Sequence, residues 1–181
     1  MGDSQHKLLL LELNEINFDV VNQYLSDNKN QFSNLKSLLD SGLFRTSSES
    51  LYEELEPWIQ WASVHTGLTY QEHNIFRLGD VVGTDKPQIF EQIEQAGFKV
   101  GSISAMNADN RLKNPAFFIP DPWTKTPSDG SFWSKSLGDA VSQAVNDNSQ
   151  ARITIKTAAQ IFLALLRFAR PKHYLRYIKF Y

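Results

Sequence analysis

The 181-residue sequence contains no cysteine. This absence excludes a disulfide framework, a cysteine-ligated zinc or haem site and a thiol nucleophile. Glycine and proline are sparse, with 9 and 7 residues, whereas the 12 phenylalanines and 4 tryptophans are typical of a folded domain. Long hydrophobic runs are also missing: the apolar run at residues 8–11 is far too short to span a membrane, and no signal-peptide cleavage site follows it. We therefore expect a cytoplasmic protein with one substantial core.

Acidic side chains are absent from the end of the chain. Residues 1–150 hold all 20 acidic residues against 11 lysines and arginines, whereas residues 151–181 contain seven lysines and arginines and no acid. A duplex-binding domain carries its positive charge on a folded face, so we expect no nucleic-acid partner. The basic segment instead predicts contact with an acidic partner or an anionic membrane surface.

The spacing of apolar residues predicts an α/β fold. Strands are expected over 7–13, 43–48 and 98–104, and helices over 19–25, 32–39, 57–65, 88–96, 134–145 and 154–169. Their alternation indicates a mostly parallel sheet flanked by helices within residues 1–150, followed by an apolar helix and a basic-aromatic tail over 151–181. Residues 105–134 break every regular pattern and predict a long loop whose aromatic side chains pack down as a lid.

Oxygen-bearing side chains follow two of the predicted strands. Glu12, Asn14 and Glu15 come at the end of the first strand, and Asn107 and Asp109 follow the strand at 98–104. Ligands of parallel sheets bind at the carboxyl ends of the strands, and hard divalent cations prefer oxygen ligands. Glu12, Asn14 and Glu15 are therefore candidate metal ligands. The alternative is that Asn14 and Glu15 cap the turn or helix that follows.

Two segments carry a resemblance to a known family. Residues 35–42 read LKSLLDSG, and residues 61–75 read WASVHTGLTYQEHNI. Together with the apolar strand before them, they resemble the N-terminal part of the alkaline phosphatase-like superfamily, which includes sulfatases, type I phosphodiesterase/nucleotide pyrophosphatases and phosphoglycerol transferases. The likeness extends over residues 7–105. Its most specific part is Thr-Gly-Leu at 66–68 followed by His-x-Ile at 73–75.

The resemblance implies a hydrolase or transferase of phosphate or sulfate esters, with Zn²⁺, Mn²⁺, Mg²⁺ or Ca²⁺ as cofactor and an anionic saccharide or glycerophosphate substrate. Asn14 falls at the family's first metal-binding Asp, and Glu15 takes the adjacent position. The family's nucleophile would fall at Pro57, and no Ser, Thr or Cys lies between Tyr52 and Ala62. The family's remaining metal ligands come from the C-terminal half of a longer chain, so we expect a partial domain that is inactive alone. The alternative is a non-catalytic derivative that serves as a binding module.

Three glutamates precede the predicted helix that starts at Pro57. Carboxylates are stabilised beside the positive N-terminus of a helix, which is the ordinary interpretation of Glu53, Glu54 and Glu56. The functional interpretation places Glu54 or Glu56 where the family's nucleophile would stand, to bind a metal or to act as a general base on water. His73 matches the His of the family motif, where its role is local structure.

Basic and aromatic side chains alternate between Phe162 and Phe180. Such a segment is typical of a peripheral helix at an anionic membrane interface. The other interpretation is a connector whose apolar side is covered by sequence outside residues 1–181. Flotation with anionic liposomes distinguishes the two.

Overall fold

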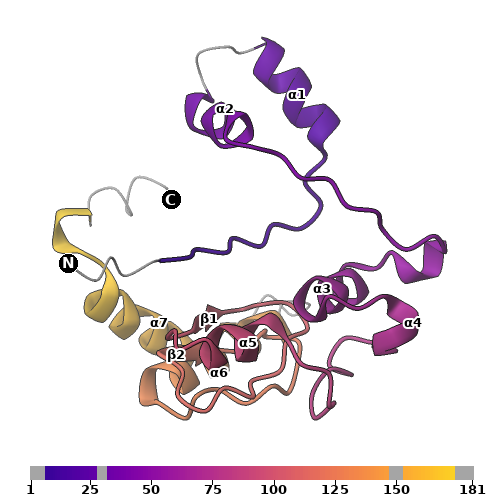
Figure 1. Cartoon of the computed structure of the whole chain (residues 1–181). Helices are drawn as coiled ribbons and strands as arrows, with labels where there is room; N and C mark the ends of the chain where they lie inside the picture. The colour runs from indigo at the N-terminus through magenta and orange to yellow at the C-terminus, as the bar shows by residue number, and fades with distance from the viewer. Residues whose placement is uncertain (1–6, 28–31, 147–152, 174–181) are drawn as a thin grey trace, which may run out of the picture. The chain divides into compact units, whose positions relative to one another are not determined.

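The computed structural model describes residues 7–27, 32–146 and 153–173 (Figure 1). The chain divides into two compact units, Met1–Ser48 and Glu49–Tyr181, which we call the N-terminal and C-terminal units. The regular elements, in chain order, are α1 (Phe18–Asp27), α2 (Ser33–Asp40), the 3-10 turn η1 (Tyr52–Glu54), α3 (Pro57–Thr66), α4 (Tyr70–His73), α5 (Ile89–Gln95), β1 (Gly101–Ile103), β2 (Phe117–Ile119), α6 (Phe132–Asn146), α7 (Ile155–Phe168) and the 3-10 turn η3 (Pro171–His173).

The N-terminal unit contains the two helices that the sequence predicts over 19–25 and 32–39. The Asn17 carboxamide oxygen accepts hydrogen bonds from the backbone N–H groups of Asp19 (2.9 Å) and Val20 (3.1 Å) and so caps α1. No residue of α1 or α2 is buried. The two helices are therefore fixed by local signals and not by a core of their own.

The predicted strands over 7–13 and 43–48 are wrong. Both segments lack secondary structure, and the leucines of the first are exposed, with 88% of Leu9 accessible. A strand needs a neighbour to accept and donate its backbone hydrogen bonds. Among the described residues of the N-terminal unit no other segment forms a strand. The apolar run at 7–13 has the composition of a buried strand, but no described segment of the N-terminal unit pairs with it.

The C-terminal unit contains a parallel pair of strands, so the fold is mixed α/β. β1 and β2 pair in register from Gly101 opposite Phe117 to Ile103 opposite Ile119. A Cβ atom at Gly101 would lie 2.5 Å from the Phe117 ring, so this close approach requires glycine. β2 lies inside the segment 105–134, which corrects the prediction of an uninterrupted loop there.

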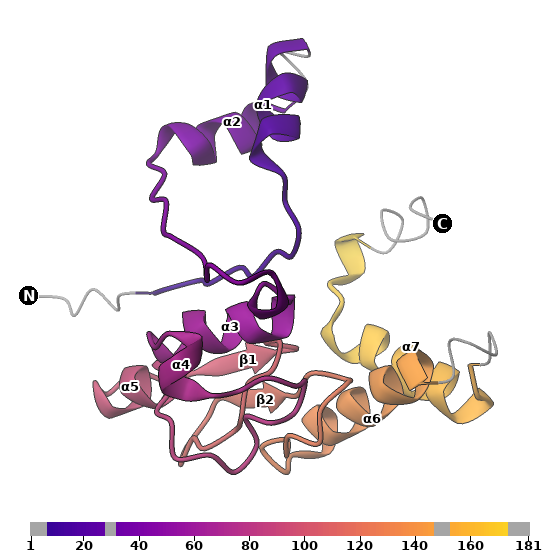
Figure 2. The ribbon, with the colours of Figure 1, turned by 90° about the vertical axis from the view of Figure 1, so that its right-hand side faces the viewer.

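The core of the C-terminal unit lies around these strands and α3, α5 and α6 (Figure 2). Phe90 of α5 packs with Val100, Ala105 and Ala108, and its ring meets Phe118 of β2 edge-on at 6.5 Å. A second cluster joins α3 to the loop after α4 through Ala62, Ile75 and Val81. α3 contacts α4 and α5, and α6 contacts β2.

Four helices of the C-terminal unit confirm the predictions. α3 begins at Pro57 in the first helical position, α5 is followed by Gly97 at a φ of 89°, and α6 and α7 match the periodic segments 134–145 and 154–169. α7 packs against α6, and Thr154 caps it through a hydrogen bond from the Thr157 N–H. No helix among the described residues is long and apolar enough to cross a bilayer.

Candidate functional site

The three predicted metal ligands lie just before α1. Asn14 and Glu15 form an exposed turn in which Glu15 has a φ of 57°, and Glu12 is half-buried. Asn17, and not Asn14 or Glu15, supplies the side-chain cap of α1.

Glu54 is a buried carboxylate. It is 5% exposed, and both of its oxygens lie 3.2 Å from the Gln71 side-chain nitrogen of α4. Gln60 of α3 donates a hydrogen bond to the Glu54 backbone carbonyl at 2.7 Å. Within the described parts of the chain, no salt bridge joins Glu54 to a lysine, arginine or histidine. The neutral amide of Gln71 thus contacts the carboxylate, while Gln60 holds the Glu54 backbone.

Glu56 has a different environment. It is exposed and occupies the position before α3, where its backbone carbonyl accepts from the N–H groups of Ile59 and Gln60. Its side chain makes no capping hydrogen bond to α3. Of the two predicted catalytic glutamates, only Glu54 is therefore held by side-chain contacts.

The predicted ligands and the predicted catalytic residues belong to different units. Glu12, Asn14 and Glu15 lie in the N-terminal unit, and Glu54 and Glu56 lie in the C-terminal unit. Over residues 7–27, 32–146 and 153–173, no three His, Cys, Asp or Glu side chains gather as a metal site. Metal binding by these residues stays a prediction.

The Thr-Gly-Leu and His-x-Ile motif forms the connection from α3 through α4. Gly67 ends α3 at a φ of 72°, and Asn74 ends α4 at a φ of 57°, a left-handed conformation that Asn tolerates. Thr69 and Glu72 form a capping box at the start of α4, with the Thr69 N–H donating to the Glu72 carboxylate at 2.8 Å. These contacts fix α4, and with it Gln71, relative to α3.

His73 of α4 makes two hydrogen bonds, one within its own turn and one to α3. Its Nδ1 accepts from the Ile75 N–H at 2.9 Å, and its Nε2 lies 3.0 Å from the Ser63 hydroxyl of α3. Because Nδ1 accepts, the neutral ring carries its proton on Nε2 and donates it to Ser63. His73 therefore cannot take a proton from Ser63 in this arrangement. This confirms the prediction of a local structural role.

Burial lowers the pKa of His73 below its usual value near 6.5. The positive charge of Lys86 also lowers the pKa, whereas the negative charges of Glu49 and Glu72 raise it and only partly offset burial. The ring is 3% exposed, so a proton added to Nδ1 would break the bond from Ile75 within the core. Neutral His73 is consequently the form that the fold requires.

Asn107 and Asp109 follow β1 as the sequence indicates, but both are buried and bonded to backbone. Asn107 accepts from the Gly79 N–H and donates to the Trp58 carbonyl, each at 2.8 Å. Asp109 accepts from the Gly83 N–H at 3.0 Å. These side chains tie the segment after β1 to the turns that follow α4, so they are structural in this arrangement.

Two further hydrogen-bonded carboxylates, the buried Asp121 and the partly buried Asp129, are not indicated by the sequence analysis. Asp121 accepts from the N–H groups of Asn107 (2.9 Å) and Trp123 (3.0 Å). Asp129 accepts from the Phe118 N–H and the Ser134 hydroxyl at 2.5 and 2.7 Å. Burial raises the pKa of Asp129, but hydrogen bonds from Ser131, Ser134 and the Phe118 backbone outweigh this effect, and the pKa lies below its usual value.

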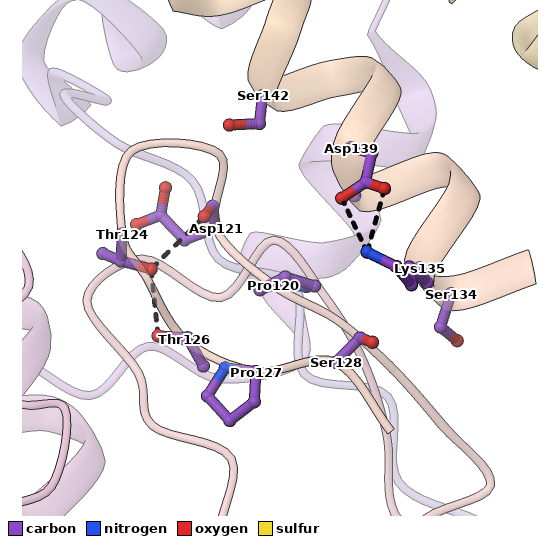
Figure 3. Close-up of a pocket in the computed structure, with 11 residues that line it drawn as sticks. Pro120, Asp121, Thr124, Thr126, Pro127, Ser128, Ser134, Lys135, Asp139 and Ser142 are labelled. Atoms are coloured by element: carbon purple, nitrogen blue, oxygen red, sulfur yellow. Dashed lines mark hydrogen bonds and ion pairs between the residues drawn. The ribbon is translucent and has the colours of Figure 1, made fainter. Parts of the chain in front are cut away.

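A small polar hollow lies between the 120–128 segment and α6 (Figure 3). Its volume is about 220 Å³, and its rim carries the Lys135–Asp139 ion pair at 3.1 Å. The hydroxyls of Thr124 and Thr126 bond each other, and Ser142 donates to the Pro122 carbonyl. These groups therefore already have partners within the protein.

The signals for the missed residues are present in the sequence but not specific. An Asp two residues before a backbone donor, as at Asp121 and Asp129, is common in turns of every kind. Only the fold brings those carboxylates to Asn107 and Phe118. Comparison of the chain with descriptions of protein families, with curated proteins and with solved structures finds no match.

Proposed function

We propose that the chain contributes part of a metal-dependent site for hydrolysis or transfer of phosphate or sulfate esters, on the N-terminal part of an alkaline phosphatase-like fold. Glu54 is the catalytic or metal-binding carboxylate of the C-terminal unit, with Glu56 beside it. Glu12, Asn14 and Glu15 are the candidate metal ligands of the N-terminal unit, and the family's remaining ligands would be supplied from outside residues 1–181. Zn²⁺, Mn²⁺, Mg²⁺ or Ca²⁺ would polarise an anionic saccharide or glycerophosphate ester. A cytoplasmic location is part of this proposal.

The observation that carries the proposal is the environment of Glu54. A buried carboxylate is costly unless a cation or several donors compensate its charge. Gln60 bonds the Glu54 backbone, and Gln71 is the residue whose side chain bonds the Glu54 carboxylate. Gln71 lies in the segment 61–75, which resembles the family. A site whose carboxylate is held by neutral donors has capacity left for a divalent cation.

A non-catalytic binding module is the second candidate, and the hydroxyls of α3 favour it. The Ser63 hydroxyl accepts from His73, and the Thr66 hydroxyl donates to the Ala62 carbonyl at 2.7 Å. Neither is available as a nucleophile while these bonds persist. On this alternative the fold binds an anionic ligand or a partner without turnover.

The first test is metal binding, because a partial site binds an ion before it turns over substrate. Mn²⁺ is titrated into the 181-residue chain, and free Mn²⁺ is followed by electron paramagnetic resonance. We expect Glu54→Gln to weaken binding at least tenfold, since it removes a charge at the ion. The matched control Glu53→Gln alters the exposed neighbour and should bind as the unchanged chain does.

Two results would favour the binding module. One is no Mn²⁺ binding by the folded chain, and the other is equal binding by the Glu54→Gln variant. Metal-stimulated hydrolysis of bis(p-nitrophenyl) phosphate that both Glu54→Gln and Glu56→Gln abolish would establish the catalytic role instead. Circular dichroism of each variant verifies that the fold is retained.

A further inference from the structure

α7 presents its polar side to the protein and its apolar side outward. Thr157, Gln160 and Ala164, which are three and four residues apart, share one side, and this side faces α6. Gln160 donates to the Ser136 hydroxyl of α6 at 3.0 Å, and the Thr157 hydroxyl donates to the Gln143 side chain. A helix that packs on a core normally has the opposite arrangement.

The outward side of α7 carries only large apolar residues and alanines. Ile155 is 90% exposed and Phe162 is 60% exposed, and Leu166 lies on the same side at a spacing of four residues. The exposed set also spreads to both flanks of this side, through Ile161, Leu163 and Leu165, whereas Phe168 contacts Trp133 of α6. At 100° a residue, the exposed apolar surface covers more than half of the helix circumference.

An aromatic and basic cluster lies at the end of the α6–α7 pair. The rings of Phe132 and Phe168 both meet Trp133 edge-on, at centroid distances of 5.1 and 5.4 Å, and Phe132 is 72% exposed. The Arg167 guanidinium lies 5.5 Å from the Phe168 ring centroid. Arg170 and Lys172 follow, and residues 153–173 contain no acid.

From these observations we infer that the outward side of α7, together with the aromatic and basic cluster, binds an anionic membrane surface. Interfacial helices combine a wide apolar side with Lys and Arg that reach lipid headgroups and with aromatic rings at the boundary. The 14 residues of α7 rise about 21 Å, less than the hydrocarbon thickness of about 30 Å, so α7 would lie in the interface.

The basic charge near α7 and the width of its exposed apolar side favour a membrane surface over a second copy of the chain or a partner helix. Two copies joined through α7 would bring together only basic side chains, Lys156, Arg167 and Arg170, with no acid to pair with them. A partner helix fills a narrow seam, whereas a fluid hydrocarbon layer covers an arc wider than half a turn. The inference does not depend on a metal or on Glu54, and so stands apart from the proposed function.

The test is flotation of the 181-residue chain with vesicles of phosphatidylcholine, either alone or mixed with phosphatidylglycerol. We expect flotation with the anionic vesicles only, weakened by added salt. Phe162→Ser combined with Leu166→Ser should weaken binding at least tenfold, and Arg167→Gln about fivefold. The matched control Phe44→Ser changes a side chain that is 96% exposed in the N-terminal unit and should float unchanged.

Three results would overturn the inference. These are no flotation with anionic vesicles, equal flotation with neutral and anionic vesicles, and full flotation of the Phe162→Ser, Leu166→Ser variant. A dimer mass by light scattering that this variant returns to monomer would assign the side to a second copy instead. Capture of a polyglutamate peptide without vesicle binding would assign it to an acidic protein.

Discussion

The two units of the chain differ in how far their apolar side chains are buried. In the N-terminal unit neither α1 nor α2 buries a residue, and Phe44 is almost fully accessible. In the C-terminal unit Phe118, Ile59 and Ile75 are 1% exposed or less, and buried polar groups fill the spaces between elements. Helices with regular apolar spacing occur in both units. Helix formation here follows local spacing and caps, whereas burial depends on which distant segments come together.

The largest expected contrast comes from one phenylalanine in each unit. Phe118→Ala should lower the free energy of unfolding of the C-terminal unit by about 3–5 kcal/mol, because it leaves a cavity beside Phe90. Phe44→Ala should change stability by about 0.5 kcal/mol at most, because its ring has no packing to lose. Urea unfolding is followed by circular dichroism, which reports the helices of both units, and by tryptophan fluorescence, which reports the C-terminal unit because all four tryptophans lie there. Equal midpoints for the two variants would contradict the contrast.

A smaller effect is expected for Asn107, which is fully buried. Asn107→Ala should destabilise the C-terminal unit by about 2–4 kcal/mol, because the Gly79 N–H and the Trp58 carbonyl lose their partner. Asn107 also has a φ of 51°, so Asn107→Gly separates the two contributions. Asn107→Gly removes the strain of a positive φ but also lacks the two side-chain hydrogen bonds. We therefore expect it to remain less stable than the unchanged protein. Asn146→Ala, at an exposed site in α6, is the control.

The smallest expected effect is the pH dependence contributed by His73. Because burial lowers its pKa in the folded state, the unfolded chain takes up a proton first as the pH falls. Stability from His73 is thus fully present above a pH of about 6.5 and is lost as the pH falls towards the lowered folded-state pKa. Urea midpoints between pH 8 and pH 5 measure this slope. His73→Gln should flatten it, and an unchanged slope would refute the assignment.

The sequence predicts the helices better than the strands, for a physical reason. Pro57 and Gly97 are local signals that act within a few residues, and α3 and α5 lie where they indicate. A strand requires a partner that local spacing does not name, so the leucine run at 7–13 was misassigned. β2 is three residues long and lies between Pro115 and Pro120, so it is too short to show an alternating pattern.

The candidate site could be predicted only as residue positions. Glu54 was singled out, but its burial depends on Gln71, which arrives from α4 17 residues later. A local structural role was expected for His73, but the sequence does not indicate its partner Ser63, which lies ten residues earlier in α3. Asn107 and Asp109 were noted for their position after a predicted strand, and backbone N–H groups of Gly79 and Gly83 donate to their side-chain oxygens. The sequence shows which side chains carry oxygen atoms, but it does not show which backbone N–H groups of the folded chain bond to those atoms.

The polar contacts between α6 and α7 respond differently from apolar contacts when lipid replaces water around the helices. Hydrophobic packing between two helices loses its driving force once hydrocarbon replaces water around them, because the surroundings are then as apolar as the contact. Hydrogen bonds such as Gln160 to Ser136 and Thr157 to Gln143 keep theirs, since water no longer competes for the same donors and acceptors. These two hydrogen bonds between α6 and α7 are therefore contacts that persist when hydrocarbon replaces water.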